Sequence, residues 1–142
     1  MTVLDAYAVI AYLRNEAAAG QVASLLRGST LMTSTSLSEV IDQLVRVYQQ
    51  DSDDVDAGLA LLSFGGMSVE PVTEDHAVLA GLLRARHYSF RQLPVTLADC
   101  TAASVALITD LPLATSDPHL LELMAAEGGD TYPLPDSKGH LA

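Results

Sequence analysis

The chain has 142 residues, 49% of them hydrophobic, which fits one domain with an adequate core and leaves no need for a second. Its formal net charge of −11 argues against a broad basic surface for nucleic acid, but it allows a nuclease whose carboxylates hold divalent cations. Lys138 is the one lysine, so the chain lacks a phosphate-binding P-loop, whose motif requires a lysine after its glycines.

Cysteine usage and the amino-terminal stretch indicate a cytoplasmic protein. Cys100 is the single cysteine, which excludes an intrachain disulfide and suits a small buried thiol in a reducing compartment. The first residues, MTVLDAYAVIAYLRN, lack a basic leader and are interrupted by Asp5, and no stretch approaches the roughly 18 apolar residues that span a bilayer. We therefore expect a soluble, cytoplasmic protein without membrane contact.

The first third of the chain alternates short apolar runs with helical periodicity. The expected elements, in order, are a strand over 2–4, helices over 6–14 and 16–27, and a strand over 30–33. A third helix begins in the Ser/Thr cluster at 33–36, and Glu39 falls in its first or second turn, off the apolar stripe. The expected core face of this helix consists of Leu37, Val40, Ile41, Leu44, Val45 and Tyr48.

The rest of the chain continues the alternation. Further strands are expected over 68–72, 111–115 and 131–134, and further helices over 51–64, 73–87, 96–109 and 118–127. Thr96 and Asp99 resemble a capping box at the start of an Ala-rich helix, and Pro118 suits the first position of the helix that follows Asp117. The acidic run at 51–56 is expected to be a solvated helix start.

Strands that alternate with helices at this density predict an α/β fold, a three-layer sandwich whose mostly parallel sheet has four or five strands flanked by helices. No internal repeat, linker or low-complexity segment divides the chain. We expect one domain over residues 1–134 and a flexible tail over 135–142.

Four carboxylates, those of Asp5, Glu39, Asp99 and Asp117, occupy the ends of strands or the first turns of the helices that follow. Each one taken singly has a structural interpretation, because an acid at a helix amino terminus accepts backbone N–H bonds and complements the helix dipole. Together they can converge on one edge of one sheet, where their mutual repulsion calls for a divalent cation. Mg²⁺ fits such oxygen ligands, and Mn²⁺ can substitute.

Four segments of the chain resemble the PIN-domain ribonucleases, and among them the VapC-like toxins of bacterial toxin–antitoxin pairs. The segments are VLDAYAVIAYL from Val3, SLSEV from Ser36, LADCTAA from Leu97 and ATSD from Ala114. The match covers about residues 1–125. The chain departs from the pattern at Ser36, where the family often has Asn, and at His119, which stands where a further acid often follows Asp117.

The resemblance implies an α/β PIN-like fold and a metal-dependent endoribonuclease that acts as a toxin. By this resemblance Asp5, Asp99 and Asp117 hold Mg²⁺ or Mn²⁺, and Glu39 holds the metal or a water on it, so that a metal-activated water cleaves RNA. Thr115 is expected to fix a carboxylate or contact phosphate from behind these ligands. The implied partners are a basic VapB-like antitoxin, the RNA substrate and a second copy of the chain in a homodimer.

The one basic and aromatic cluster lies at 84–91, ahead of the Asp99 helix. Arg84, Arg86 and Arg91 could grip a single RNA strand together with the neighbouring aromatic rings. The structural alternative is that the arginines complement a helix carboxyl end while the rings pack inward.

The residues disfavour a phosphotransfer or phosphatase-like α/β domain, and a non-catalytic PIN-like binding module stays open. A phosphoacceptor domain would require a lysine near its last strand, and a haloacid-dehalogenase-like phosphatase would require an aspartate where Tyr7 stands. A non-catalytic PIN-like binding module would keep the acids only for folding.

Two other residues are not expected to act in the site. Asp42, one turn after Glu39, is expected on a solvated face, and Cys100 has no partner base that would make it a nucleophile.

Overall fold

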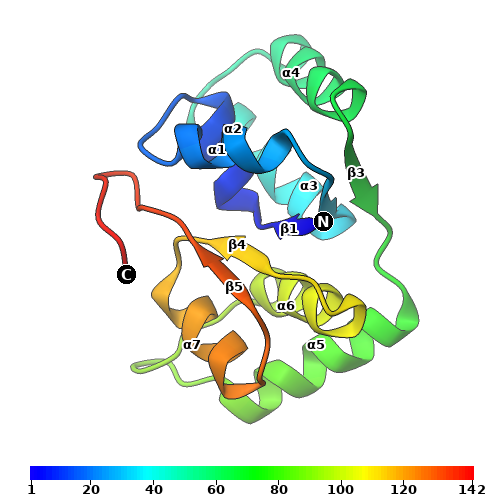
Figure 1. Cartoon of the computed structure of the whole chain (residues 1–142), viewed down its shortest axis with the longest axis vertical. Helices are drawn as coiled ribbons and strands as arrows, with labels where there is room; N and C mark the ends of the chain where they lie inside the picture. Colours follow the sequence, from blue (N-terminus) through cyan, green and yellow to red (C-terminus); the bar gives the residue numbers. More distant parts are fainter.

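The computed structural model describes all 142 residues and contains a single five-stranded sheet (Figure 1). Its strands are β1 (Thr2–Leu4), β2 (Thr30–Thr33), β3 (Met67–Glu70), β4 (Leu113–Thr115) and β5 (Thr131–Pro133). The strand order is β3-β2-β1-β4-β5, and every neighbouring pair is parallel. The predicted α/β fold with a mostly parallel sheet is thus confirmed, with five strands. No helix combines the length and apolar character needed to span a bilayer.

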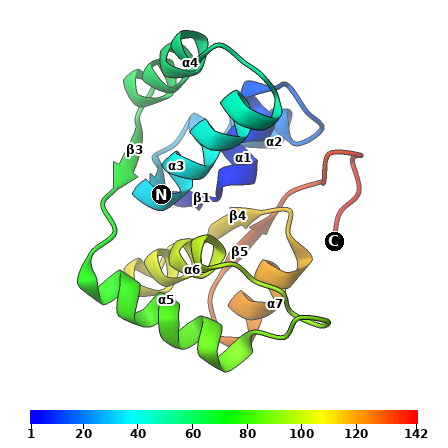
Figure 2. The same ribbon diagram turned by 180° about the vertical axis from the view of Figure 1, so that it is seen from behind.

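Helices cover both faces of the sheet, which gives the three layers visible in Figures 1 and 2. The helices are α1 (Ala6–Leu13), α2 (Ala19–Leu26), α3 (Ser34–Asp42), α4 (Ser52–Phe64), α5 (Glu74–His87), α6 (Leu97–Thr109) and α7 (Pro118–Ala126). A π-helical segment, η1 (Gln43–Val47), continues α3. The first four helices lie on one face, and α5, α6 and α7 lie on the other.

Each face of the sheet has its own hydrophobic core, because successive strand residues point to opposite sides. Leu4, Met32 and Ala114 pack with the helices of the first face. Their neighbours Val3, Leu31 and Leu113 pack with α5, α6 and α7. The register pairs Val3 with both Leu31 and Leu113, so β1 is central to both cores.

Small side chains allow α6 to lie close to the sheet. Cys100, Ala102, Ala103 and Ala106 are all buried, and the helix also packs along α5. The predicted capping box is present: the Asp99 N–H donates to Thr96 Oγ1 at 3.1 Å, and the Thr96 N–H donates to Asp99 Oδ2 at 3.0 Å. The amino terminus of α6 is therefore fixed at the edge of the sheet where the strands end.

The expected core face of the third helix is wrong at two of its six positions. Ile41 is 41% exposed and Tyr48 is 40% exposed, whereas Val40 and Leu44 are fully buried. A π-helical turn over Gln43–Val47 rotates Tyr48 away from the α-helical stripe, whereas Ile41 lies before that turn, at the solvent-facing margin of α3. The Arg14 guanidinium covers the Tyr48 ring at 3.4 Å from its centroid.

The strand expected over 111–115 is shorter than the sequence indicates. Asp110 ends α6 in the left-handed conformation, with φ of 55°, and Leu111 and Pro112 lead into β4. The Pro112 carbonyl still accepts the Val3 N–H at 2.9 Å, although proline itself cannot donate to a ladder. The other element boundaries lie within a few residues of those expected.

The carboxyl-terminal segment begins with residues that contact the amino-terminal end of α1 and the first core. Tyr7 Oη donates to the Pro135 carbonyl at 2.9 Å, and Leu134 is fully buried against the first core. The Asp136 carboxylate accepts the Lys138 and His140 N–H groups at 2.9 Å each. Flexibility of residues 135–142 stays a prediction.

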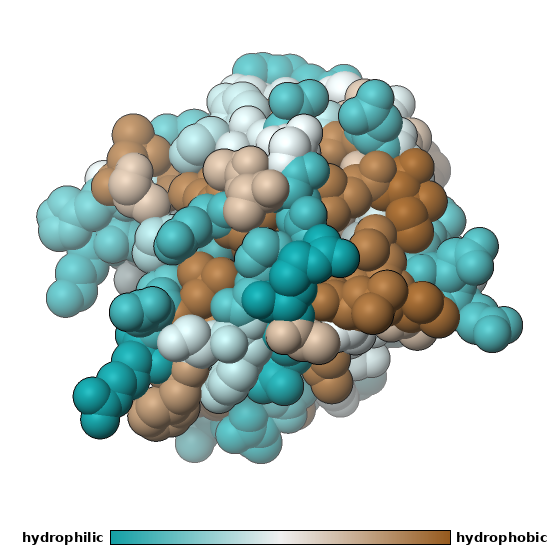
Figure 3. Space-filling model, turned by 90° about the horizontal axis from the view of Figure 1, so that it is seen from below, coloured by the Kyte–Doolittle hydropathy of each residue, from teal (hydrophilic) through white to brown (hydrophobic).

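Apolar side chains also lie exposed on α5, where Val78 and Leu82 are 57% and 53% accessible. Figure 3 views the molecule from the side of α5 and α7 and shows hydrophobic patches among hydrophilic ones. This face offers apolar area for the expected homodimer, which stays a prediction.

The close packing of α6 gives a test of the fold. Ala103→Leu should lower the free energy of unfolding by about 1–3 kcal/mol, because a larger side chain cannot fit between α6 and the sheet without strain. Urea unfolding followed by circular dichroism measures the change. Ala125→Leu on the exposed face of α7 is the control and should change stability by less than about 0.5 kcal/mol. Equal stability of the two variants would contradict this packing.

Candidate active site

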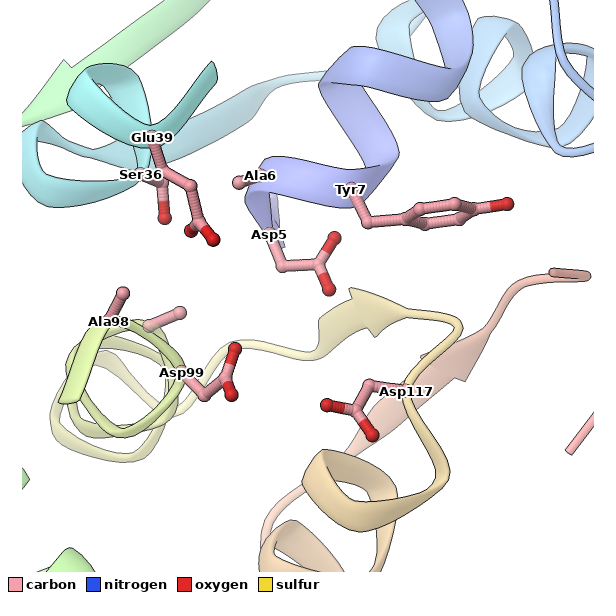
Figure 4. A pocket seen from close by; sticks show the side chains of 9 residues that line it. Asp5, Ala6, Tyr7, Ser36, Glu39, Ala98, Asp99 and Asp117 are labelled. Carbon is pink, nitrogen blue, oxygen red and sulfur yellow. The ribbon is translucent and has the colours of Figure 1, made fainter. Parts of the chain in front are cut away.

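The fold brings the four predicted carboxylates to one pocket at the carboxyl ends of the strands. Asp5 follows β1 directly, Asp117 lies two residues after β4, Asp99 is in the first turn of α6, and Glu39 projects from α3. Figure 4 shows these four side chains around a common space. The pocket is also lined by Ala6, Tyr7, Ser36, Ala98 and Ala102.

The strand order explains why residues from both ends of the chain meet here. From β1 the chain proceeds outward to β2 and β3, and then returns to the other side of β1 to form β4 and β5. Between β1 and β4 the direction of winding therefore reverses, and ligands of open α/β sheets bind at such a point. The Asp5 N–H also donates to the Ala114 carbonyl at 3.2 Å, which joins the ends of the two strands.

Three of the four acids begin helices as well as line the pocket. Asp5 Oδ1 accepts the Ala8 N–H at 2.8 Å, and Asp117 Oδ1 accepts the His119 N–H at 2.9 Å. Asp99 closes the capping box of α6 through Oδ2. Each cap uses one carboxylate oxygen, so one oxygen of each aspartate is not used by its cap. The structural interpretation of these acids is correct, and it leaves them able to bind a ligand as well.

Burial and mutual repulsion raise the pKa values of three pocket acids, Asp5, Glu39 and Asp99. Burial raises the pKa of Asp5 from 3.8 to about 7; hydrogen bonds from Thr115 and Ala8 offset part of this effect, and the charges of Asp99 and Asp117 add to it. The pKa of Glu39 is raised by burial and then by the charge of Asp99. Burial also raises the pKa of Asp99, partly offset by its bonds to Thr96. A bound cation would relieve this repulsion.

The donor set fits a hard, hydrated divalent cation. All four candidate ligands are carboxylates, which Mg²⁺ and Mn²⁺ prefer, and Mg²⁺ usually keeps several waters while binding one or two carboxylates directly. No three His, Cys, Asp or Glu side chains lie close enough together to form a ready cage. Waters between the ion and the carboxylates would span the remaining gaps.

Thr115 links two of the acids from below the pocket. It is fully buried at the end of β4; its Oγ1 accepts the Asp117 N–H at 3.0 Å, and its hydroxyl lies close enough to Asp5 to lower the pKa of that carboxyl. This position matches the supporting position expected from the sequence. Its role in holding the two carboxylates stays a prediction.

Several pocket residues were not foreseen as lining the site. Ser36 is buried there, and its Oγ accepts the Thr33 hydroxyl at 3.0 Å. The sequence marked Ser36 only as a departure from the family pattern. In the sequence, nothing except nearness in the chain to Asp5 or Asp99 marks Tyr7, Ala98 and Ala102 as pocket residues.

The basic cluster is partly committed to contacts within the chain. Arg84 Nε donates to the Val95 carbonyl at 3.0 Å, and its guanidinium lies 4.3 Å from the centroid of the Tyr88 ring. Arg86 forms an ion pair with Glu127, whereas Arg91 is exposed. Contact of these arginines with RNA stays a prediction.

Two further residues behave as the sequence indicates. Asp42 forms an exposed ion pair with Arg46 at 2.8 Å, and the hydrogen bond from Arg46 lowers its pKa, which agrees with a solvated face. Burial raises the pKa of the Cys100 thiol to about 11, so the reactive thiolate is scarce at neutral pH.

Comparison with solved structures shows that the fold is shared by toxin proteins at low sequence identity. VapC20 of Mycobacterium tuberculosis, a toxin described as cleaving the sarcin-ricin loop, superposes with a TM-score of 0.70 and 19% identity, covering 91% of this chain and 96% of that one. VapBC2 of Rickettsia felis, bound to a promoter DNA fragment, gives a TM-score of 0.70 and 12% identity, covering 94% and 98%. FitAcB of Neisseria gonorrhoeae gives 0.66 and 16%, covering 93% and 96%.

The family comparison covers nearly the whole domain. A search of curated proteins finds no match. Residues 2–125 match the family described as PIN domain, a span that runs from β1 into α7 and contains all four pocket acids. The chain therefore belongs to the PIN-domain family.

Proposed function

We propose that this protein is a Mg²⁺- or Mn²⁺-dependent endoribonuclease and the toxin of a toxin–antitoxin pair. The observation that carries the proposal is the convergence of Asp5, Glu39, Asp99 and Asp117 on one pocket at the carboxyl edge of the sheet. Membership of the PIN-domain family supports a nuclease, and the similarity to VapC and FitAB structures supports a toxin.

In this proposal the three aspartates hold the cation through the oxygens that their helix caps leave free. When bound, the ion would lower the pKa of a water and stabilise the charge that develops on the phosphate. Glu39 is the one pocket acid outside a helix cap, and its raised pKa suits it to accept a proton from the attacking water. Thr115 keeps Asp5 and Asp117 oriented from behind.

In this proposal the protein also binds a basic antitoxin, which its negative charge would attract. At a net charge of −11 the chain would draw a basic polypeptide toward the pocket and raise the association rate. Apolar anchors of such an antitoxin would find a hollow between α1, α2 and α4, lined by Tyr12, Leu26, Leu61 and Leu62. Leu61 is 72% exposed there. Structures described as VapBC2 and FitAB complexes share this fold, which supports an antitoxin as the occupant.

Removing one carboxylate charge tests the catalytic assignment. Asp5→Asn and Asp99→Asn should each lower the rate of RNA cleavage in Mg²⁺ or Mn²⁺ by at least about 100-fold, because each removes the charge of a proposed metal ligand. Both substitutions keep the side-chain volume, so the fold should be unchanged. Asp75→Asn, an exposed acid in the first turn of α5, is the matched control and should cleave at the wild-type rate. Undiminished cleavage by folded pocket variants would refute the assignment and favour a non-catalytic module.

The raised pKa of Asp5 predicts that the metal-free protein loses stability as pH rises. The folded state binds the Asp5 proton up to about pH 7 but the unfolded state only up to about 4, so stability falls between these values and then levels off. From pH 5.5 to pH 8 this one group should cost about 2 kcal/mol. Thermal melts in EDTA measure the loss, and Asp5→Asn should reduce it.

Saturating Mn²⁺ should raise the melting temperature most at pH 8, because the ion binds the folded state and compensates the ionised carboxylates. A melting temperature that Mn²⁺ leaves unchanged at both pH values would contradict a cation site in this pocket.

Antitoxin inhibition should include a competition of charge at the pocket. We expect an Arg or Lys in the antitoxin tail to reach one of the four acids, so Mn²⁺ should weaken inhibition by the cognate tail peptide. The peptide with that basic residue changed to Ala should inhibit less and should no longer respond to Mn²⁺. Equal inhibition by both peptides, with no effect of Mn²⁺ on either, would mean that the tail acts by occlusion alone.

A further inference from the structure

A short hairpin between α5 and α6 carries an aromatic ring and a cation into solvent. Ser89 and Leu93 pair across the turn, with N–H to carbonyl distances of 3.0 and 2.9 Å in the two directions. Leu93 and Val95 are buried in the second core and anchor the base of the turn. Figures 1 and 2 show this loop projecting beside α7. Phe90, near its tip, is 80% exposed.

The hairpin combines an exposed ring with a cation that no acid of the chain neutralises. Arg86 is paired with Glu127, and Arg14 and Arg46 also lie beside acids, whereas Arg91 is exposed and, like Arg27 and Lys138, forms no ion pair. Arg91 differs from those two because its hairpin leads into the helix that carries Asp99. Arg84 lies over the Tyr88 ring and holds the loop through the Val95 carbonyl. A free cation next to an exposed ring is the pattern that binds single-stranded nucleic acid by phosphate contact and base stacking.

The hairpin is also placed to deliver a strand to the acids. It leads directly into Thr96, which caps α6, and Asp99 stands in the first turn of that helix. A hollow lined by Gly81, Arg84, Ala85, Tyr88 and Leu97 lies between α5 and the start of α6. A strand held at the tip could follow this hollow to the carboxyl edge of the sheet.

We infer that the hairpin of residues 88–93 is the docking surface for single-stranded RNA, with Phe90 stacking on a base and Arg91 contacting a phosphate. This inference rests on the proposed ribonuclease function and adds where the substrate is held. RNA is favoured over the antitoxin as occupant, because a basic polypeptide would be repelled by the cations here. Arg84 and Arg86 make contacts within the chain that position the loop.

The test measures the steady-state cleavage of a short single-stranded RNA in Mn²⁺. Phe90→Ala should raise KM by about 5-fold to 100-fold, the range that one lost stacking contact predicts, and leave kcat unchanged. Arg91→Ala should raise KM and lower the slope of log KM against log salt by about 0.7, as expected for one lost phosphate contact. Fluorescence anisotropy of the labelled RNA in EDTA gives binding without hydrolysis and should show the same order of affinities.

Matched controls come from the opposite helical layer, where Phe64 is 93% exposed and Arg27 is exposed. Phe64→Ala and Arg27→Ala should leave KM and kcat at wild-type values. If the wild-type chain cleaves RNA and both hairpin variants keep its KM, the docking surface is refuted while the ribonuclease proposal stands. If the wild-type chain neither binds nor cleaves RNA, the ribonuclease proposal fails and the docking inference fails with it.

Discussion

The hydrogen bonds between aspartate side chains and helix amino termini are the interactions on which the pocket depends. Asp5, Asp99 and Asp117 each accept a backbone N–H with one oxygen, and so fix where α1, α6 and α7 begin. The helix dipoles stabilise these charges, which otherwise repel one another in a partly buried pocket. The same bonds that start the helices therefore hold three carboxylates at one edge of the sheet.

Without a bound cation, the buried and clustered carboxylates lower the stability of the folded state. Asp5 is only 7% exposed, and its pKa of about 7 means that burial opposes its charge more strongly than its hydrogen bonds favour it. The two cores on either side of β1 supply the compensating stability through apolar burial. A less buried acid would cap α1 without this cost, so capping alone does not explain the burial of Asp5.

The acidic pocket and the exposed arginine of the hairpin lie on different parts of the surface. An acidic protein that cleaves RNA would need both. The acids lie in a pocket at the end of the sheet, whereas an unpaired arginine and an exposed ring lie on a hairpin that leads to it. Three of the other six Arg and Lys side chains pair with acids of the same chain. RNA could thus be attracted at one place and cleaved at another, although the molecule as a whole is negative.

The helices, the strands and the acids at their junctions could be predicted from the sequence alone, because they depend on contacts a few residues apart. Thr96 with Asp99, and Thr33 before its helix, are local hydrogen-bond patterns that residue spacing records. The strand order, the inclusion of Ser36 and Tyr7 in the pocket, and the exposure of Ile41 and Tyr48 became known only from the packed fold. It also showed that Glu127, distant in sequence, pairs with Arg86, while Arg91 stays free. Such pairings follow from how distant elements pack, which no local spacing encodes.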